Sequence, residues 1–410
     1  MAKNAVTYLD LAGKSKTTTW DEVFRATNAV KAFFTELCGR FVERDQVAEA
    51  VKYALMIREH VLIHGPGGSA KTAVADTVIQ GIQDAQIWSM DFSKFMGESR
   101  VFGDFDVKHA QETGELRHLI RGSLVEANFA NLGEFSDASM ELQRALMRVL
   151  NERQFIRGPQ KLKVPLITAV ANTNFDPLQE RARHMGFEAV LDRFMFWVRV
   201  VYVEKPENKM EMLDIFLERK QDRPLPPLKL DDIVMASGVV LGMNLLTNLY
   251  VKQAFRELRS AFVAARGGRR MSDRRWLKSA QILEASAILN GKTEADFDDL
   301  RPLSLVWCES PDEEKHFIKA YDDDLAKWRS DQHKQVVDAG YYPKSLATMK
   351  LGESHYFFHT SPGALMFPIG SWYTGRAFVP LEKGGQPKDF PLGIMQFPVP
   401  KNAACPECKT

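Results

Sequence analysis

Apolar residues recur at helical spacing in two stretches near the start of the chain, WDEVFRATNAVKAFFTEL (20–37) and RDQVAEAVKYALMI (44–57). Each stretch predicts an amphipathic helix. A short apolar run at 60–64 predicts a strand, and a glycine-rich turn separates it from another helical pattern, KTAVADTVIQGI (71–82). The run IWSMDF (87–92) predicts the next strand. This order of strand, glycine turn, helix and strand is typical of a βαβ unit.

Three later apolar runs, at 129–132, 164–171 and 194–204, predict further strands of the same sheet. A long helical pattern at 139–151 separates the first two of these runs. Because helices connect consecutive strands, we expect a parallel sheet and an α/β fold.

The second half of the chain changes character twice. A proline-rich segment, DRPLPPLKLDD (222–232), breaks the pattern, and residues 244–300 then show almost wholly helical spacing, which predicts a small all-α domain. One more helix is expected at 316–337. From residue 341 onward, aromatic residues, glycine and proline indicate short strands and turns, and thus a β-rich C-terminal extension.

Composition narrows the class of protein. A chain of 410 residues with 45% hydrophobic and 26% charged residues should fold into two or three globular domains. The net charge of +1 gives no global attraction to nucleic acid or to an anionic membrane, so nucleic acid is not expected as a partner. No run of about 18 apolar residues and no signal peptide is seen, so we expect no membrane span and a cytoplasmic protein with reduced cysteines.

The sequence GPGGSAKT lies between a predicted strand and a predicted helix, where a phosphate-binding loop is found. Glycines let backbone N–H groups surround a phosphate, Lys71 can reach the β- and γ-phosphate oxygens, and Thr72 offers a hydroxyl to Mg²⁺. Ala70 departs from the usual pattern, which has glycine there. A glycine-rich turn without a ligand is the alternative. The expected nucleotide-binding residues are Gly65, Pro66, Gly67, Gly68, Ser69, Ala70, Lys71 and Thr72.

Several segments together resemble the MoxR family of AAA+ ATPases, over roughly residues 40–300. They read FVERDQVAEAVKYALMIREHVLIHGPGGSAKT, ESRVFGDFD, LIRGSLVEANFANLGEFSDASMELQRALMRVLNERQF, ANTNFDP and LDRF. Within the family, MSDRRWLKSAQILEASAILNG looks most like the RavA subgroup. The family also accepts alanine at the position of Ala70.

The resemblance implies a P-loop AAA+ core followed by a helical lid. The expected division is an N-terminal helical leader (1–40), the αβ nucleotide-binding core (41–205), the lid (206–305) and an extension of unknown role (306–410). It also implies ATP or ADP with Mg²⁺, bound between subunits of a homo-oligomeric ring that is often a hexamer. Such rings remodel partner proteins in a chaperone-like way, commonly with a von Willebrand factor A-type protein.

The resemblance places the Walker B carboxylates at the end of ANLGEF. Glu134 is present and is expected to orient or deprotonate the attacking water, but Gly133 stands where the family has aspartate for Mg²⁺. Asp137 and Asn131 are the nearest polar substitutes. Because Thr72 and the phosphates can still hold Mg²⁺, we expect nucleotide binding to survive and the hydrolysis rate to be in doubt. Replacing Gly133 by aspartate should then raise the rate.

The remaining catalytic candidates are an asparagine and two arginines. Asn174 matches sensor 1, with Asn172 as the competitor and a turn role as the alternative. Arg193 matches the arginine finger, which reaches a neighbouring subunit, and an internal salt bridge is its alternative. The lid position that senses nucleotide, sensor 2, matches Arg274. The competing arginines for the last two roles are Arg199 and Arg275.

The sequence does not decide the roles of two regions. The stretch from 96 to 125 resembles the family's insertion in helix 2, which projects toward the pore or a partner, and an ordinary helix and loop packed on the sheet is the alternative. In the extension, HxxxH and CxxC spacings could supply four ligands to zinc, although two free thiols and two histidines are the simpler interpretation. The zinc candidates are His355, His359, Cys405 and Cys408.

The leading hypothesis is therefore a MoxR/RavA-like ATPase that remodels a partner protein. A nucleotide-gated scaffold that binds ATP with little or no hydrolysis is the alternative, and Gly133 favours it. A nucleic-acid translocase is a third interpretation, which only the basic cluster at 266–275 supports.

Overall fold

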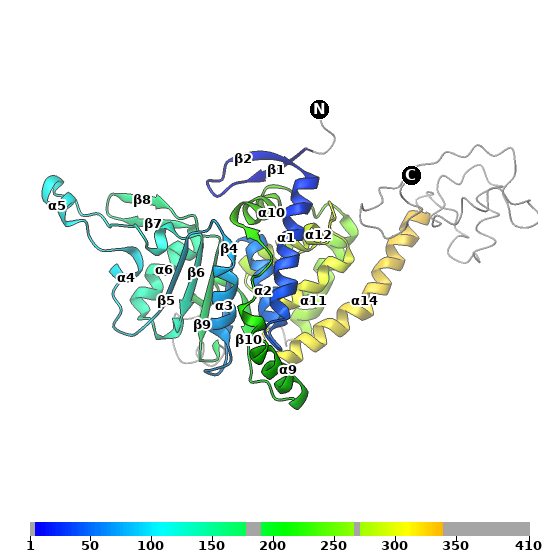
Figure 1. Ribbon diagram of the computed structural model, residues 1–410. Coiled ribbons are helices and arrows are strands. Elements are labelled where there is room, and N and C mark those ends of the chain that lie inside the picture. Colours follow the sequence, from blue (N-terminus) through cyan, green and yellow to red (C-terminus); the bar gives the residue numbers. More distant parts are fainter. Residues whose placement is uncertain (1–4, 178–189, 266–270, 339–410) are drawn as a thin grey trace, which may run out of the picture. The chain divides into compact units, whose positions relative to one another are not determined.

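The computed structural model describes residues 5–177, 190–265 and 271–338, and the side chains up to 331. The chain divides into two compact units, Met1–Asp323 and Asp324–Thr410. The first unit holds the sheet and the helices considered below (Figure 1). The candidate zinc ligands and the expected β-rich extension lie outside the described residues.

The core of the first unit is a five-stranded parallel sheet in the order β10-β3-β9-β6-β5. This order confirms the predicted parallel α/β fold. Since the strands are parallel, their carboxyl ends meet at one edge of the sheet, where ligands of α/β proteins bind. The strands are β3 (His60–His64), β5 (Ile87–Asp91), β6 (Phe129–Gly133), β9 (Thr168–Thr173) and β10 (Phe194–Arg199).

Helices cover both faces of this sheet. On one face α3 (Lys71–Gln80) packs against β6 and β9. On the other face α6 (Met140–Glu152) closes an apolar core in which Trp88, Leu132 and Leu146 are buried. Successive strand residues point to opposite faces, so the odd-numbered residues of β5 and β6 face α3.

The predicted helices near the start of the chain are confirmed as α1 (Trp20–Cys38) and α2 (Asp45–Ile57). A capping box starts α1, in which Thr19 and Glu22 satisfy each other's backbone N–H groups. Since α1 packs against helices of the lid as well as α2, it belongs structurally with them.

The leader predicted as helical over 1–40 begins instead with a β-hairpin, β1 (Ala5–Leu9) and β2 (Ser15–Thr19). Only Val6 and Thr18 of its two strands are buried, so the alternation that reveals a strand is absent from the sequence. Tertiary packing stabilises the hairpin, because its first strand packs against α10 (Leu230–Gly242).

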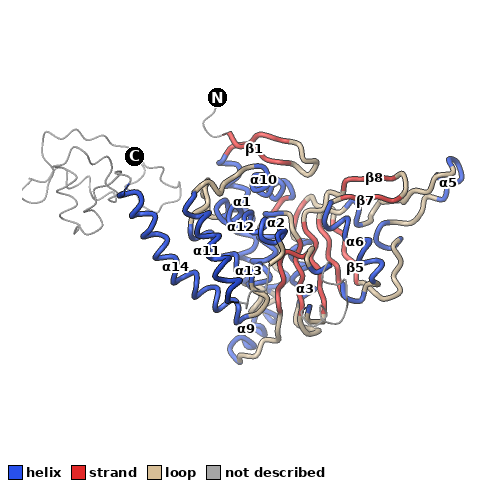
Figure 2. Tube along the Cα trace, turned by 180° about the vertical axis from the view of Figure 1, so that it is seen from behind, coloured by secondary structure: helices blue, strands red, loops and turns tan. Residues whose placement is uncertain are grey.

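The predicted helical domain consists mainly of α9 (Pro206–Leu217), α10, α11 (Leu249–Ala265), α12 (Asp273–Leu289), η4 (Phe297–Leu303) and α13 (Ser304–Trp307). Figure 2 shows α10, α11, α12 and α13 gathered on one side of the central sheet. Stacked aromatic rings form their core, with Phe255 4.1 Å from Trp276 and 5.8 Å from Trp307 between ring centroids. The predicted last helix begins earlier than expected, as α14 (Pro311–Asp338).

The segment between β5 and β6 carries two short helices, α4 (Ser99–Phe102) and α5 (Val107–Thr113), and extends away from the sheet (Figure 1). It lies against a second hairpin that the sequence does not reveal, β7 (Gln154–Arg157) and β8 (Gln160–Lys163). His118 donates its backbone N–H to the side-chain oxygen of Gln160 at 2.9 Å. The segment is thus anchored on β8 and is not simply packed on the sheet. Two further pairs of residues, β4 (Ile82–Gln83) and β11 (Leu228–Lys229), form a small parallel ladder.

Candidate functional site

The loop Gly65–Thr72 joins the end of β3 to the start of α3 at the carboxyl edge of the sheet. Gly65 has φ 154°, and a Cβ there would lie 2.0 Å from the carbonyl oxygen of Val200. Gly68 has φ 74°, in the left-handed region that favours glycine. Ala70 caps α3 in the same region, with φ 65° and ψ 19°. Ala70 thus adopts the left-handed conformation that glycine favours.

Lys71 is buried at the centre of this loop. Its ammonium donates to the carbonyl oxygens of Gly65 and Pro66 at 2.9 and 2.8 Å, and to the side-chain oxygen of Asn174 at 2.9 Å. Asn174 in turn donates its amide to both carboxylate oxygens of Glu134, at 3.0 and 2.8 Å. Burial lowers the pKa of Lys71, and the Glu134 carboxylate partly opposes this shift. The structure thus joins three predicted site residues in one hydrogen-bonded chain.

Glu134 reaches this position through a sharp change of direction after β6. Its backbone is left-handed, with φ 48° and ψ 43°, and leads directly into the 3-10 turn η2 (Phe135–Asp137). Within the described part of the chain, the Asp137 carboxylate has no hydrogen bond to Lys71 or Asn174. Non-glycine residues in this conformation are uncommon and often occur at functional sites.

The two competing asparagines lie deeper, under α3. Asn172 donates to the side-chain oxygen of Asn131 at 3.0 Å, and Asn131 donates to Asp76 of α3 at 2.6 Å. Each asparagine has only 2% of its surface exposed. This buried chain ties β9 and β6 to α3, so neither asparagine lies with Lys71 and Glu134.

Gly133 faces a carboxylate from the neighbouring strand. It pairs in register with Asp91, the last residue of β5, so both residues face the same side of the sheet. A Cβ on Gly133 would lie 1.8 Å from a carboxylate oxygen of Asp91 and 3.0 Å from its Cγ. The expectation that aspartate at 133 simply supplies a missing group is therefore incomplete, because Asp91 already fills that space.

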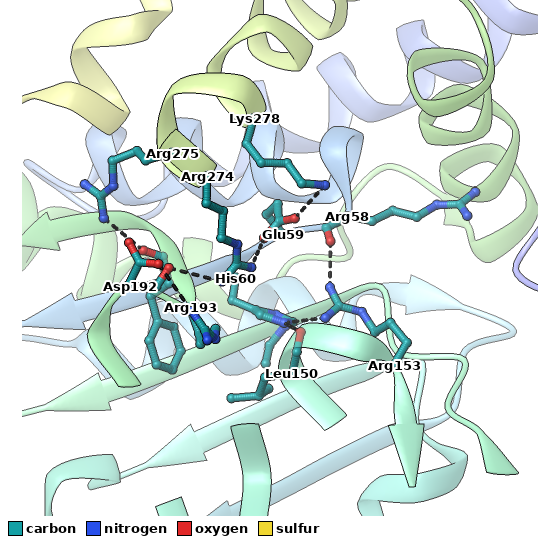
Figure 3. Close-up of polar contacts among 12 residues, drawn as sticks. Arg58, Glu59, His60, Leu150, Arg153, Asp192, Arg193, Arg274, Arg275 and Lys278 are labelled. Carbon is teal, nitrogen blue, oxygen red and sulfur yellow. Dashed lines mark hydrogen bonds and ion pairs between the residues drawn. The ribbon is translucent and has the colours of Figure 1, made fainter. Parts of the chain in front are cut away.

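The predicted arginines lie at the amino ends of the strands, and Figure 3 shows them beside Glu59, His60 and Asp192. Arg193 precedes β10 and contacts the carboxylate of Asp192 at 3.2 Å. Arg274 of α12 donates to Glu59 and to the backbone oxygen of Asp192, both at 3.3 Å, and Lys278 contacts Glu59 at 3.0 Å. Glu59 directly precedes β3 and Gly65 directly follows it, so the length of this five-residue strand, about 20 Å over six residue steps, separates them. Neither Arg193 nor Arg274 lies at the phosphate loop of its own chain.

The competing arginines have different surroundings. Arg275 is buried, donates to the backbone oxygens of Val306 and Phe194 at 2.9 and 3.2 Å, and lies 5.0 Å from the ring centroid of Trp197. These contacts give it a packing role between lid and core. Arg199 is exposed at the carboxyl end of β10, beside the loop.

Two buried histidines mark the ends of β3. Burial and the Arg153 guanidinium hold the pKa of His60 well below its usual value, and its Nδ1 accepts the N–H of Ala169. Burial also lowers the pKa of His64, which precedes the loop, to about 4. Both rings are therefore neutral at physiological pH, and the strand that carries the loop bears no charge of its own.

A pocket that the sequence did not reveal lies between core and lid. It has a volume of about 230 Å³ and is lined by residues around the start of α2, by the end of β10, and by residues of α13, the start of α14 and the turn between these two helices. Arg44 links this pocket to the phosphate loop, since its Nε donates to the backbone oxygen of Ser69 at 3.1 Å. In the sequence, this pocket could have been anticipated only from the position of Arg44 directly before α2.

Among the described residues, no group of three or more histidine, cysteine, aspartate or glutamate side chains is placed to hold a metal ion. No helix in the described ranges is long and apolar enough to cross a membrane.

Two known protein families together match the residues that form the sheet and the lid. Residues 28–254 match the family described as the MoxR domain in the MoxR–vWA–β-propeller ternary systems, and residues 251–320 match an AAA lid domain.

Individual relatives agree with these matches. An uncharacterized protein of Methanocaldococcus jannaschii is 27% identical over 278 residues, which are 68% of this chain and 71% of the relative. The chaperone MoxR1 of Mycobacterium tuberculosis is 27% identical over 172 residues, 42% of this chain and 44% of that protein. A structural protein of Acidianus two-tailed virus is 27% identical over 162 residues, 39% of this chain and 26% of that protein.

A crystal structure of a Cytophaga hutchinsonii protein, described as a candidate ATPase, has the same fold. The TM-score is 0.57 at 18% identity, over 75% of this chain and 96% of that one. At this identity the likeness supports the fold alone.

Proposed function

Because the chain belongs to the MoxR family of AAA+ proteins, we propose that it binds ATP with Mg²⁺ at Gly65–Thr72 and hydrolyses it to remodel a partner protein. The observation that carries the proposal is the chain of hydrogen bonds from Lys71 through Asn174 to Glu134. It brings together, at one edge of the sheet, a lysine that would bind phosphate, a polar amide and a carboxylate that would act as general base. Its proximity to Lys71 supports Asn174 over Asn172 as sensor 1.

The roles of the loop follow from its geometry. Backbone N–H groups at the start of α3 would bind the phosphates, and Lys71 would neutralise their charge. The pocket beside Arg44 would hold the nucleoside, since it connects the loop to the lid. Glu134, held by Asn174, would orient the attacking water and accept its proton.

The residues present fit a magnesium ion that is held together with the nucleotide. The Thr72 hydroxyl lies in the first turn of α3, and the carboxylates of Glu134 and Asp91 follow or end neighbouring strands. Such oxygen atoms, with phosphates and water, are the ligands that Mg²⁺ prefers. When bound, the ion would neutralise charge that develops on the phosphates.

A ring assembly is part of the proposal. Arg193 lies at the end of the sheet away from the loop and lines a pocket of about 310 Å³ with Arg144, Arg148 and Arg157. Glu152 also lines this pocket, but four arginines outnumber this one carboxylate, and the surface suits the phosphates of a neighbouring subunit's nucleotide. Helix α9 leaves five large apolar side chains exposed, as expected for a subunit contact. These are Met210, Met212, Leu213, Phe216 and Leu217.

The partner and the finer classification rest on family likeness. The family description includes vWA proteins, which supports a von Willebrand factor A-type partner. The segment anchored on β8 exposes Val107, Leu116 and Leu119 and could meet a partner or the pore. A hexameric ring, the RavA subgroup and the cytoplasmic location remain predictions.

Nucleotide binding and turnover of three proteins test the proposal. We expect Lys71→Ala to lose binding of a fluorescent ATP analogue, because the ammonium at the centre of the loop is removed. Glu134→Gln should retain binding and lose turnover, by at least about 100-fold. Lys31→Ala, an exposed lysine of α1, is the matched control. Tight binding by Lys71→Ala would show that the nucleotide lies elsewhere.

A nucleotide-gated scaffold is the second candidate, and Gly133 favours it. A virus structural protein among the relatives is in keeping with such a role. Tight ATP binding and nucleotide-dependent assembly with negligible turnover in the unmodified protein would support the scaffold over the ATPase.

A further inference from the structure

Gly133 leaves the expected second carboxylate out of the Walker B segment, and the sheet offers a replacement. We propose that Asp91, at the end of β5, supplies the carboxylate for the magnesium ion of the nucleotide site. This inference rests on the proposed nucleotide binding and concerns a residue within the matched MoxR domain but outside the motifs that carry the resemblance in the sequence.

The first argument is the position of the Asp91 carboxylate. One of its oxygens lies 1.8 Å from the place where a Cβ on Gly133 would stand. The Asp91 side chain thus occupies the space into which a side chain at 133 would extend. A carboxylate from β5 and one from β6 would reach this space by different backbone routes, and both cannot fit there together.

The second argument is the direction in which this space faces. Trp88, Met90 and Leu132 contribute to the apolar core on the α6 side of the sheet. Asp91 and Gly133 have the opposite parity and so face α3. The hydrogen bond from Asn131 to Asp76 shows that the odd-numbered residues of β6 lie on the side of the sheet that α3 covers.

The third argument is the position along α3. Gly133 is two residues beyond Asn131 toward the carboxyl end of β6, whereas Thr72 is one helical turn before Asp76. Helix α3 connects parallel strands and therefore runs opposite to them. The step from Asn131 to Gly133 along β6 and the step from Asp76 back to Thr72 along α3 thus lead in the same direction, over a similar distance. The Asp91 carboxylate therefore lies on the side of the sheet and at the level of Thr72, the predicted magnesium ligand.

The remaining environment allows this role. Asp91 is exposed, and among the described residues it has no ion pair with a lysine or arginine that would neutralise it. The alternative donor Asp137 lies three residues beyond Glu134, past the left-handed turn at that residue. Asn131, the other alternative, is already bonded to Asp76 and Asn172.

The test measures metal affinity rather than turnover. Mn²⁺ replaces Mg²⁺, and electron paramagnetic resonance reports free Mn²⁺ in the presence of the protein and ADP. Binding of a fluorescent ADP analogue in EDTA is measured in parallel. We expect Asp91→Asn to bind the analogue in EDTA as the unmodified protein does, and to lower the Mn²⁺ affinity of the ADP complex about tenfold or more. Asp137→Asn, the matched control, should leave both unchanged.

An exchange of residues between the strands tests the shared position. Gly133 is not in the left-handed region, so its backbone accepts aspartate. The double variant Asp91→Gly, Gly133→Asp should recover most of the Mn²⁺ affinity, whereas Gly133→Asp alone should melt at a lower temperature because two carboxylates then compete for one space.

The outcomes separate this inference from the proposed function. An unmodified protein that binds no nucleotide contradicts the proposed function itself. Nucleotide binding with unchanged Mn²⁺ affinity in Asp91→Asn contradicts only the role of Asp91. A loss of Mn²⁺ affinity in Asp137→Asn, or a folded double variant as weak as Asp91→Asn, does the same.

Discussion

Ala70 holds a backbone conformation that usually belongs to glycine. With φ 65° it caps α3 in the left-handed region, where a Cβ approaches the following carbonyl oxygen. We expect Ala70→Gly to raise the free energy of unfolding by about 1 kcal/mol, since relief of this strain outweighs the added freedom of the unfolded chain. Chemical denaturation of both proteins measures the difference.

Ala73, three residues along the same helix, provides the matched control. It is exposed and helical, so Ala73→Gly should lower the free energy of unfolding by about 0.5–1 kcal/mol. Equal destabilisation by both substitutions would show that Ala70 carries no strain.

The residues of the site differ in how far the sequence reveals them. The phosphate loop is a local pattern, and Lys71 and Glu134 could each be assigned from neighbouring residues. Asp91 could not, because its relation to Gly133 depends on the register between two strands that lie about 40 residues apart in the chain. The choice between Asn172 and Asn174 also required the structure, since only the fold shows which of them is buried under α3.

At the scale of elements, long apolar patterns predict helices and strands well, whereas short polar hairpins cannot be predicted from the sequence. Helices α1, α2 and α6 and all five strands of the central sheet are confirmed within a few residues. Hairpin β7–β8 has the sequence QFIRGPQKLK, in which charged and amide residues outnumber apolar ones. Its strands form because the segment around His118 lies against them, and that contact is not local in the sequence.

The N-terminal hairpin depends on one helix of the lid. A Cβ on Gly238 of α10 would lie 2.4 Å from the backbone oxygen of Leu9 and 2.9 Å from the ring of Tyr8. We expect Gly238→Ala to displace the hairpin and lower the free energy of unfolding by about 1–3 kcal/mol. Denaturation measures the loss, with Gly97→Ala, where a Cβ meets open space, as the control. A more stable Gly238→Ala protein would show that helix propensity outweighs the contact with the hairpin.

At the scale of the whole molecule, the two ends of the sheet carry complementary halves of the proposed reaction. The loop with Lys71 lies at the carboxyl ends of the strands, and Arg193 lies at their amino ends. If Arg193 acts on a neighbouring subunit, Lys71→Ala and Arg193→Ala proteins should each lack turnover, with Arg193→Ala lower by about 1,000-fold or more. An equimolar mixture should regain turnover, because some interfaces then combine an intact loop with an intact arginine.

Two further measurements make this experiment decisive. Arg193→Ala alone should still bind the fluorescent ATP analogue, and the mixture should be assembled as the unmodified protein is. Recovery is not expected from a mixture of Lys71→Ala and Glu134→Gln, because both variants lack the same half of the site. A mixture of Arg193→Ala and Lys71→Ala that assembles and stays inactive would place the action of Arg193 within its own subunit.

The overlap of Asp91 with the side-chain position of Gly133 also bears on how such a chain can arise by descent. An ancestor with aspartate at 133 and a neutral residue at 91 needs two substitutions to reach this arrangement. One order passes through a protein with two carboxylates in a single space, and the other through a protein with none. If Asp91 holds the metal as proposed, both intermediates would be inferior to either end point, and the two positions would evolve as a unit. The metal site would then be retained although the signature that identifies it in a sequence is lost.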